Sequence, residues 1–378
     1  MIKALLKLEK ILKENKLDAV LISSISNIVY LTGYSGFSKE EREAYLFVVK
    51  NAQYILTDGR YTQAVKTLIP GFKLIKISSR VSFEKSIKEL IKKHRIKRMG
   101  FEGNNLTFLE HKKLSSRFND LNHFSMSKFR AIKNAEEIFA IEKACQLGDK
   151  AFDYILKKIK LGVSEKELAF EIEFFIKKNG GDISFRPIVA FGKNSAIPHH
   201  QPSDKRLAKS DKLVLLDLGV KLNNYCSDMT RTVFFGKPSA EQKRMYQTVL
   251  EAQSHALDLL NSLFMIHNSI PAKKIDKIAR DYIISKGYKT IPHSVGHGIG
   301  INVHEAPHLS PKSKDILKQG MVFSIEPGIY IPGLGGVRIE DLVVLEKSGL
   351  PPHLAGPRLL TLSPKDLIMG SFNIPCSQ

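Results

Sequence analysis

The chain has 378 residues, 43% of them hydrophobic, and its 58 lysines and arginines outnumber its 38 acidic residues to give a formal net charge of +20. This length exceeds what one hydrophobic core usually serves and predicts two domains of roughly 100 to 200 residues each. The three cysteines have no paired spacing, which excludes a disulfide framework or a cysteine zinc site, and no apolar run approaches the roughly 20 residues that cross a bilayer. We therefore expect a cytoplasmic protein with no membrane association.

The excess positive charge is spread along the chain. Its densest stretch, IKKHRIKRMG at residues 91–100, is short and is not interleaved with the aromatic side chains on which single-stranded nucleic acids stack. We interpret the charge as a solvated basic surface and expect no nucleic-acid partner.

The first third of the chain predicts a small α/β domain. An amphipathic N-terminal helix precedes apolar runs typical of buried strands, and apolar positions three and four apart in residues 81–96 predict a further helix. The strand-like runs are residues 18–24, 45–50, 54–61 and 98–103. Residues 122–134 are polar and mixed and are interpreted as a connection, so we expect an N-terminal domain of residues 1–128.

The remainder, residues 129–378, predicts a second domain in which helices alternate with strands. Asn134 is the expected N-cap of a long helix, and Ser164 with Glu167 form a capping-box pattern for the next helix, which stops at residues 179–181. Two more helices and four strand-like runs follow. They are helices 240–262 and 272–286, and strands 212–220, 225–235, 321–331 and 337–346. Because the strands are joined by short turns, we expect an α+β fold with an antiparallel sheet.

Acidic residues interrupt these apolar strands. Asp217 follows three apolar residues in LVLLDLGV, where an ionised carboxylate would lose much of its hydration. Asp228 comes 11 positions later, and the asparagines at residues 223 and 224 suit a hairpin turn that would bring both carboxylates to one site.

Glu326 and Glu340 repeat the pattern, because each lies in an apolar run and the proline and glycines between them predict a second hairpin. Taken singly, each acid is explained better by an ion pair with arginine or by backbone hydrogen bonds. Four acids converging on one apolar region repel one another unless cations lie between them. With His297 they form a ligand set for two divalent ions, and its chemistry suits manganese, cobalt, iron or catalytic zinc.

Six segments with this order and spacing resemble the pita-bread metallopeptidases, which comprise methionine aminopeptidases, prolidases and aminopeptidases P. The segments are PHHQPS at residues 198–203, LLDLG, YCSDMTRT, HSVGHGIGINVHEAP at residues 293–307, SIEPGIY and GVRIED. Residues 17–37 and 55–64 look like the N-terminal domain that prolidases, aminopeptidases P and creatinases share. The complete ligand set argues against a creatinase, and HEAP in place of HEEP leans away from a methionine aminopeptidase.

The resemblance implies an α+β protein: a C-terminal pita-bread (creatinase/aminopeptidase) domain with an antiparallel sheet and flanking helices, preceded by a smaller creatinase-like α/β domain. Site residues are carried over position by position. The implied metal ligands are Asp217, Asp228, His297, Glu326 and Glu340. The implied catalytic residues are Glu326 as proton shuttle, His199 and His304, and the implied substrate-binding residues are His293 and Arg338. His200 competes with His199, which we prefer, and Arg338 fits a partner of the ligands as well as a substrate-binding group.

The resemblance further implies hydrolysis by a two-metal centre with manganese, or alternatively cobalt, zinc or iron. We expect a cytoplasmic Xaa-Pro aminopeptidase that removes an N-terminal residue preceding proline by hydroxide attack. The alternative is an Xaa-Pro dipeptidase, or prolidase, and the third possibility is a non-catalytic pita-bread protein that binds peptides or nucleic acid. The expected partners are proline-containing peptides and further copies of the chain in a homodimer or larger homo-oligomer.

Overall fold

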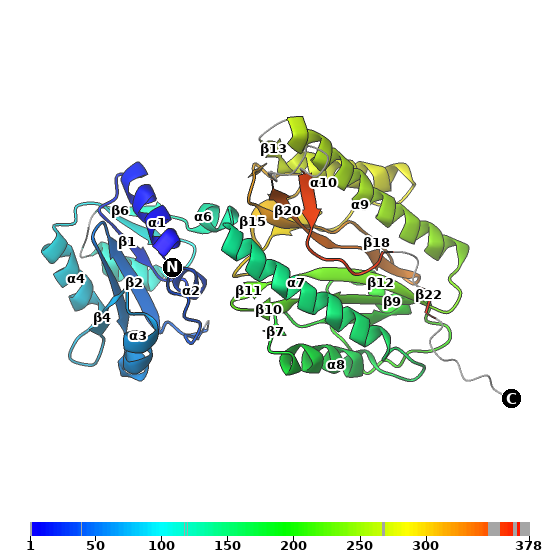
Figure 1. Ribbon diagram of the computed structural model, residues 1–378, viewed down its shortest axis with the longest axis horizontal. Coiled ribbons are helices and arrows are strands. Elements are labelled where there is room, and N and C mark those ends of the chain that lie inside the picture. The colour runs from blue at the N-terminus through cyan, green and yellow to red at the C-terminus, as the bar shows by residue number, and fades with distance from the viewer. Residues whose placement is uncertain are drawn as a thin grey trace. The chain divides into compact units, whose positions relative to one another are not determined.

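The computed structural model describes residues 2–38, 40–116, 118, 120–266, 269–346, 356–365 and 369–370. The chain divides into two compact units, Met1–Phe129 and Arg130–Gln378, drawn in blue to cyan and in green to red in Figure 1. None of the helices described in these ranges is both long and apolar enough to cross a membrane. Cys145 and Cys226 are buried, and Cys376 lies outside the described residues.

The first unit is built on a mixed sheet, which confirms the predicted α/β class. In spatial order its strands are β4 (Lys73–Lys76), β3 (Ala52–Thr57), β2 (Ala44–Val49), β1 (Ala19–Ile22), β5 (Met99–Glu102) and β6 (Leu121–Phe124). The central strand β1 runs antiparallel to β2 and parallel to β5, and all of its residues are buried. The helices of this unit are α1 (Ile2–Glu14), α2 (Ile25–Thr32), α3 (Thr62–Leu68), α4 (Phe83–His94) and α5 (Phe108–Ser115), with the short helix η1 (Gly59–Tyr61).

The predicted connection at residues 122–134 is wrong in part. Strand β6 pairs in parallel with β5 there, and helix α6 (Ser127–Ala131) follows. Phe124 and Phe129 are buried, and their ring centroids lie 5.9 Å apart. The sequence around these two phenylalanines is mostly polar, so it did not predict the apolar contact that they form in the folded chain.

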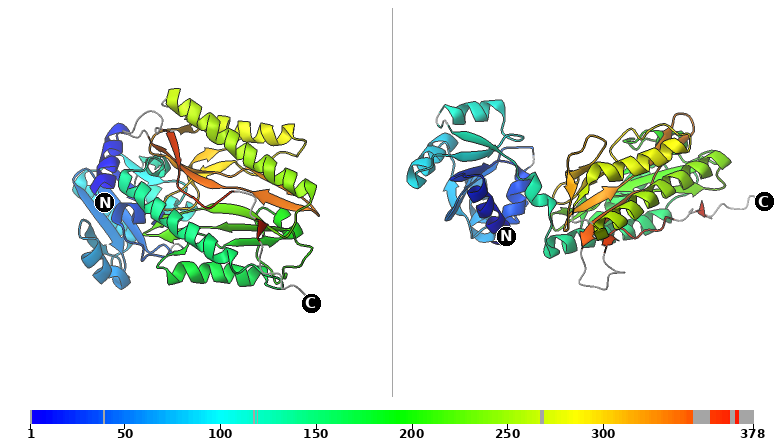
Figure 2. Two further views of the ribbon diagram at one scale, coloured as in Figure 1. Left: turned by 45° about the vertical axis from the view of Figure 1, so that its right-hand side comes forward. Right: turned by 90° about the horizontal axis from the view of Figure 1, so that it is seen from above.

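In the second unit, two pairs of helices cover two sheets. The helices are α7 (Ala135–Leu156), α8 (Glu165–Lys178), α9 (Ala240–Ile266) and α10 (Ala272–Ser285), and η2 (Gly192–Ala196) is a short helix. Helices α7 and α8 pack on one sheet, with strand order β22 (Met369–Gly370), β12 (Met229–Phe235), β9 (Leu213–Leu218), β8 (Ile188–Phe191). Helices α9 and α10 pack on the other, with strand order β15 (Glu305–Leu309), β14 (Gly296–Gly298), β17 (Val322–Ile325), β20 (Asp341–Glu346), β21 (Gly356–Leu359). Figures 1 and 2 show both helix pairs beside their strands.

The capping signals give the expected helix starts. Asn134 accepts hydrogen bonds from the first turn of α7, and Ser164 with Glu167 form the capping box of α8.

Smaller strand groups complete the unit. They are β7 (Asp182–Ile183), β10 (Val220–Leu222) and β11 (Tyr225–Cys226); β13 (Ile270–Pro271) and β16 (Ile316–Leu317); and β18 (Gly328–Ile331) with β19 (Gly335–Arg338). The predicted α+β architecture with an antiparallel sheet is confirmed.

Both predicted hairpins form, but the long strand-like runs are broken. Asn223 and Asn224 turn between β10 and β11 with φ of 48° and 72°, a left-handed conformation that asparagine tolerates. Pro327 cannot donate to a ladder and separates β17 from β18. Consequently Glu326 lies in the gap between those strands, and Glu340 lies in the corresponding gap between β19 and β20.

Candidate metal centre

The second unit contains a cavity of about 580 Å³ that all nine predicted site residues line. They are Asp217, Asp228, His297, Glu326, Glu340, His199, His293, His304 and Arg338. Phe185, Ile188, Ser294, Val303 and His308 also line it, and the sequence did not single them out. The structure therefore brings together nine predicted residues that span 141 positions, from His199 to Glu340.

Strand geometry places the acids side by side. Asp217 lies on β9 directly opposite Thr230 on β12, and Asp228 lies in the short gap just before β12. The hydroxyl of Thr230 donates to Oε2 of Glu340 at 2.7 Å, while the backbone N–H of Glu340 donates to the carbonyl of Thr230 at 3.1 Å. Thr230 thus links strand β12, which lies beside Asp217 and Asp228, to the segment that carries Glu340.

Two carboxylate oxygens in the cavity have no hydrogen-bond donor among the described residues. They are Oδ1 of Asp217 and Oε1 of Glu340, both buried. A buried anionic oxygen without a donor loses its hydration and gains nothing in return, so these atoms need a cation. The ligand atoms of Asp228, His297 and Glu340 lie within 4.8 Å of one another, close enough to hold one metal ion.

The acids also perturb one another. Burial raises the pKa of Asp228 well above its ordinary value, and the neighbouring charge of Glu340 raises it further. Burial and the charge of Glu326 raise the pKa of Glu340 in the same way, and burial raises the pKa of Glu326. Divalent ions between these carboxylates would remove the repulsion and favour the ionised forms.

His297 presents a ring nitrogen to the acids. Its Nδ1 lies 3.2 Å from the carbonyl of Gly298, and because a carbonyl only accepts, Nδ1 must carry the proton. Nε2 then has a free lone pair, 3.4 Å from Oε1 of Glu326 and 3.6 Å from Oδ2 of Asp228. Burial lowers the pKa of His297, which favours the neutral imidazole that binds metals.

A directed hydrogen-bond chain runs along one wall of the cavity. Arg338 donates to Oδ2 of Asp217 at 2.6 Å and to the hydroxyl of Tyr330 at 2.9 Å. Nδ1 of His293 donates to the carbonyl of Ser294 at 2.8 Å, so Nε2 accepts from Tyr330, also at 2.8 Å. Arg338 is 3% exposed, and its guanidinium group is already hydrogen-bonded to Asp217 and Tyr330. This favours a role in orienting the metal ligands over a role in binding substrate.

The two adjacent histidines of PHHQPS face different surroundings. His199 lines the cavity, whereas Nε2 of His200 lies 2.8 Å from Oε2 of the buried Glu165. His304 packs edge-on against the predicted ligand His297, and their ring centroids lie 4.3 Å apart. Burial lowers the pKa of His304 to about 4, so its imidazole is neutral at physiological pH.

Sequence reasoning missed Tyr330 and Thr230, although both lie in segments that it quoted. In a strand, alternate residues face the same side, and Thr230 is two positions beyond Asp228. That spacing was a usable signal for Thr230. Tyr330 reaches Arg338 and His293 only through the β18–β19 hairpin, and no local pattern predicts those contacts.

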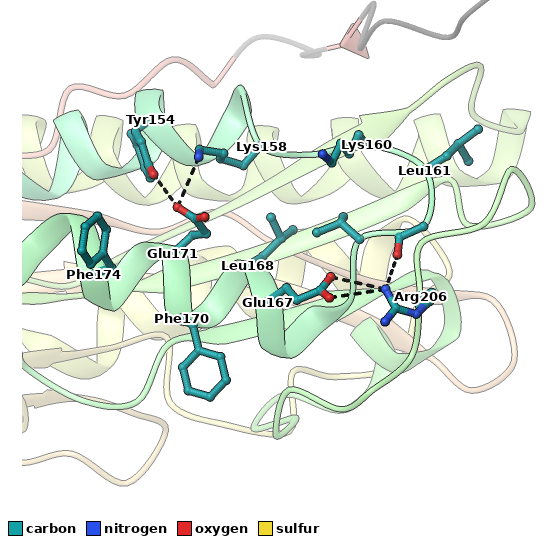
Figure 3. Close-up of a pocket in the computed structure, with 12 residues that line it drawn as sticks. Tyr154, Lys158, Lys160, Leu161, Glu167, Leu168, Phe170, Glu171, Phe174 and Arg206 are labelled. Carbon is teal, nitrogen blue, oxygen red and sulfur yellow. Dashed lines mark hydrogen bonds and ion pairs between the residues drawn. The ribbon is translucent and has the colours of Figure 1, made fainter.

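A second hollow, of about 880 Å³, lies between the C-terminal end of α7 and α8, and Figure 3 shows its lining. Four of its charged groups form two ion pairs. Glu171 accepts from Tyr154 and lies 3.4 Å from Lys158, and Arg206 lies 3.4 Å from Glu167. The residues that line this hollow offer no converging set of metal ligands, so the metal chemistry belongs to the acid-lined cavity.

Known proteins resemble the whole chain. Residues 140–347 match the model of metallopeptidase family M24, and residues 5–139 match the model of the creatinase/prolidase N-terminal domain. The Xaa-Pro dipeptidase of Pyrococcus furiosus is 38% identical over 354 residues, covering 91% of this chain and 95% of that protein.

Two solved structures extend the comparison. The Xaa-Pro dipeptidase from Bacillus anthracis superposes with a TM-score of 0.86 at 34% identity, covering 97% of this chain and 99% of the other. The X-Pro aminopeptidase from Thermotoga maritima superposes with a TM-score of 0.79 at 33% identity, covering 93% and 97% of the two chains.

Proposed function

The chain belongs to metallopeptidase family M24, and from that premise we propose that it is a metal-dependent Xaa-Pro peptidase whose preferred substrates are Xaa-Pro dipeptides. This choice reverses the order of the two activities that the sequence suggested, because the dipeptidases among the relatives support the alternative better than the aminopeptidase. The main observation behind the proposal is that two buried carboxylate oxygens in the cavity of His297, Oδ1 of Asp217 and Oε1 of Glu340, have no donor within the described part of the chain.

The residues present fit two divalent ions, which Asp217, Asp228, His297, Glu326 and Glu340 would hold. When bound, such ions lower the pKa of a water towards neutrality and polarise a carbonyl oxygen. Manganese is our first choice because hard carboxylate ligands dominate the set, with cobalt, zinc and iron as alternatives.

The side chains around the acids have separate tasks in this proposal. Glu326 lines the cavity, accepts a proton from the attacking water and passes it to the leaving proline nitrogen. His304 and His199 donate hydrogen bonds to the oxygen on which negative charge develops. His293, held by Tyr330, borders the bound substrate.

Selection for proline requires a shaped pocket, because an Xaa-Pro bond has no N–H for a general peptidase to bind. The cavity wall supplies apolar side chains for the proline ring in Phe185, Ile188 and Val303. The catalytic groups and this apolar wall lie in one cavity, so one bound substrate would contact both.

The deciding experiment measures hydrolysis of a Xaa-Pro dipeptide beside a Xaa-Pro-Xaa tripeptide, with each of the four metals and with chelator. Chelator-sensitive cleavage of the dipeptide alone supports the proposal. Preferential cleavage of the tripeptide would establish the aminopeptidase, which the Thermotoga maritima structure keeps as second candidate. No cleavage of either substrate with any metal would contradict both activities.

We further propose a homodimer or larger homo-oligomer in the cytoplasm, with residues 1–128 and 129–378 as separate domains. Sedimentation of the purified protein tests the assembly, and limited proteolysis tests the domain boundary. A monomer at micromolar concentration, or cleavage well away from residue 128, would contradict the respective statement.

A further inference from the structure

We propose that Glu165 is a positioning residue that holds His199 in the acid-lined cavity. Glu165 is the first residue of α8, and its side chain is fully buried. Its carboxylate accepts five hydrogen bonds from one short segment. At Oε1 the donors are the N–H of Phe191 at 2.8 Å and Nδ2 of Asn194 at 2.9 Å; at Oε2 they are Nε2 of His200 at 2.8 Å and the N–H and hydroxyl of Ser203 at 3.0 and 2.6 Å.

These bonds are not needed to begin the helix. Ser164 and Glu167 already form a complete capping box, in which the hydroxyl of Ser164 accepts from the N–H of Glu167 at 3.1 Å and Oε2 of Glu167 accepts from the N–H of Ser164 at 2.7 Å. The Glu165 carboxylate is therefore free to organise the segment from residue 191 to residue 203. Burial alone would raise the pKa of Glu165, yet the hydrogen bonds from Ser203 and His200 lower it, so it acts as an anion.

His199 lies between two anchored neighbours. On its N-terminal side, the carbonyl of Pro198 accepts a hydrogen bond from Nη1 of Arg338 at 3.1 Å. On its C-terminal side, His200 is bound to Glu165. The His199 ring itself makes no hydrogen bond to any residue that the structure describes, so its place in the cavity depends on these neighbours.

A glutamine at position 165 tests the idea because it keeps the size of the side chain. Its single oxygen can accept on one side of the former carboxylate only. Whichever way the amide is turned, its NH₂ group faces donors that it cannot accept from, either those of His200 and Ser203 or those of Phe191 and Asn194. Glu171→Gln is the matched control on the same helix, since Glu171 is 38% exposed and its partners among the described residues, Tyr154 and Lys158, lie in the hollow of Figure 3.

The first readout is independent of activity. In the full-length protein loaded with diamagnetic zinc and labelled at histidine Cε1, the His199 signal is assigned from its loss in His199→Gln. We expect this signal to shift or broaden in Glu165→Gln, with the signals of His293 and His304 unchanged and all three unchanged in Glu171→Gln. An unmoved His199 signal in Glu165→Gln overturns the proposal.

The second readout rests on the proposed peptidase function and uses a double-mutant cycle. Glu165→Gln should lower kcat/KM for a Xaa-Pro dipeptide about tenfold, and by no more than about twofold when His199 is already alanine. An equal loss in both backgrounds would show that Glu165 acts elsewhere and would overturn the proposal. If the wild-type chain is inactive, the function fails while the histidine spectrum still decides the role of Glu165.

A milder variant covers the possibility that Glu165→Gln does not fold. Ser203→Ala removes the shortest of the five hydrogen bonds, at 2.6 Å, and leaves the carboxylate in place. We expect a smaller displacement of the same His199 signal and a loss of kcat/KM that disappears in the His199→Ala background. No change in the signal would count against the proposal as directly as it does for Glu165→Gln.

Discussion

Both units of the molecule bury carboxylates at strand ends, but they satisfy them differently. In the first unit, Glu102 at the end of β5 is 4% exposed and accepts from the N–H groups of Ser23 and Ser24 at 2.6 and 2.7 Å. It also accepts from the hydroxyl of Ser23 at 3.3 Å and from the side chain of Asn27. These donors surround the N-terminus of α2, where the helix dipole favours negative charge.

In the second unit, Asp217 and Glu340 each leave a buried oxygen without a donor among the described residues, and nearby acids add repulsion. The difference teaches that a buried acid alone does not indicate function. Glu102 stabilises its own domain, whereas the unsatisfied acids require a partner from outside the chain. Four experiments can break this distinction between satisfied and unsatisfied buried acids, and Glu340→Gln has the largest expected effect.

Replacing Glu340 with glutamine should remove function without destabilising the metal-free fold. The amide cannot serve as an anionic ligand, so bound metal should fall and kcat/KM should drop at least about 10³-fold. The unfolding free energy of metal-free protein should stay equal or rise, because a repelled charge is gone. Glu346→Gln is the control, since Glu346 lies on the same strand, β20, and pairs at the surface with Arg358. Metal-free protein that is strongly destabilised by Glu340→Gln would break the distinction.

Metal and pH should act on stability in opposite senses. Burial raises the folded-state pKa values of Asp228, Glu326 and Glu340 above 3.8 for aspartate and 4.5 for glutamate. A raised carboxyl pKa means that the folded state holds its protons more tightly than the unfolded chain. Without metal, this stabilisation is complete below the ordinary pKa values and is lost as the pH rises through the raised ones.

Bound metal reverses that trend because it requires ionised carboxylates. At a free metal concentration about 1,000 times Kd, we expect about 4 kcal/mol of added stability. The gap in Tm between metal-loaded and chelated protein should therefore widen between about pH 5 and about pH 8. Scanning calorimetry at several pH values measures this gap. A gap that narrows with rising pH would mean that the acids do not hold the metal.

Glu102→Gln should show the reverse of Glu340→Gln. The amide keeps an acceptor but loses charge-assisted hydrogen bonds near α2, so the first unit should lose about 1 to 3 kcal/mol of stability. Metal binding, measured by calorimetric titration of the folded protein, should not change. Metal affinity weakened as much as by Glu340→Gln would show that the two kinds of buried acid are not distinct.

The sequence predicted elements whose signals are local. The starts of α7 and α8 follow from Asn134 and Ser164, because capping side chains bond to the backbone within three residues. The turn at Asn223 and Asn224 is equally local. The breaks beside Glu326 and Glu340 were not predicted. Pro327 was a usable local signal for the first break, whereas no local pattern marks the second break, between β19 and β20.

The candidate site shows the same limit. The buried acids and His297 were nominated from the sequence itself, and the family resemblance added the other four residues that share the cavity; their individual roles stay predictions. The contacts that orient them come from far along the chain: Glu165 is 35 positions from His200, and Tyr330 is 37 positions from His293. The sequence also left only a preference for His199 over His200, since the folded segment determines which ring faces the cavity.

Tyr330→Phe tests the smallest expected effect, because Tyr330 is a half-buried residue whose hydroxyl both donates and accepts a hydrogen bond inside the unsatisfied site. Burial raises its pKa to about 12, so at neutral pH the hydroxyl keeps its proton, donates to Nε2 of His293 and accepts from Arg338. Phenylalanine removes both bonds with little change in shape.

The metal ligands lose no direct contact in Tyr330→Phe, so metal content should stay at the wild-type value. His293 loses the bond that fixes its ring, and kcat/KM should fall about tenfold. Metal analysis and dipeptide kinetics on the same sample separate the two effects. If metal were lost along with activity, the hydrogen-bond chain through Arg338 would be holding Asp217 in place, and satisfied groups would contribute to the metal centre itself.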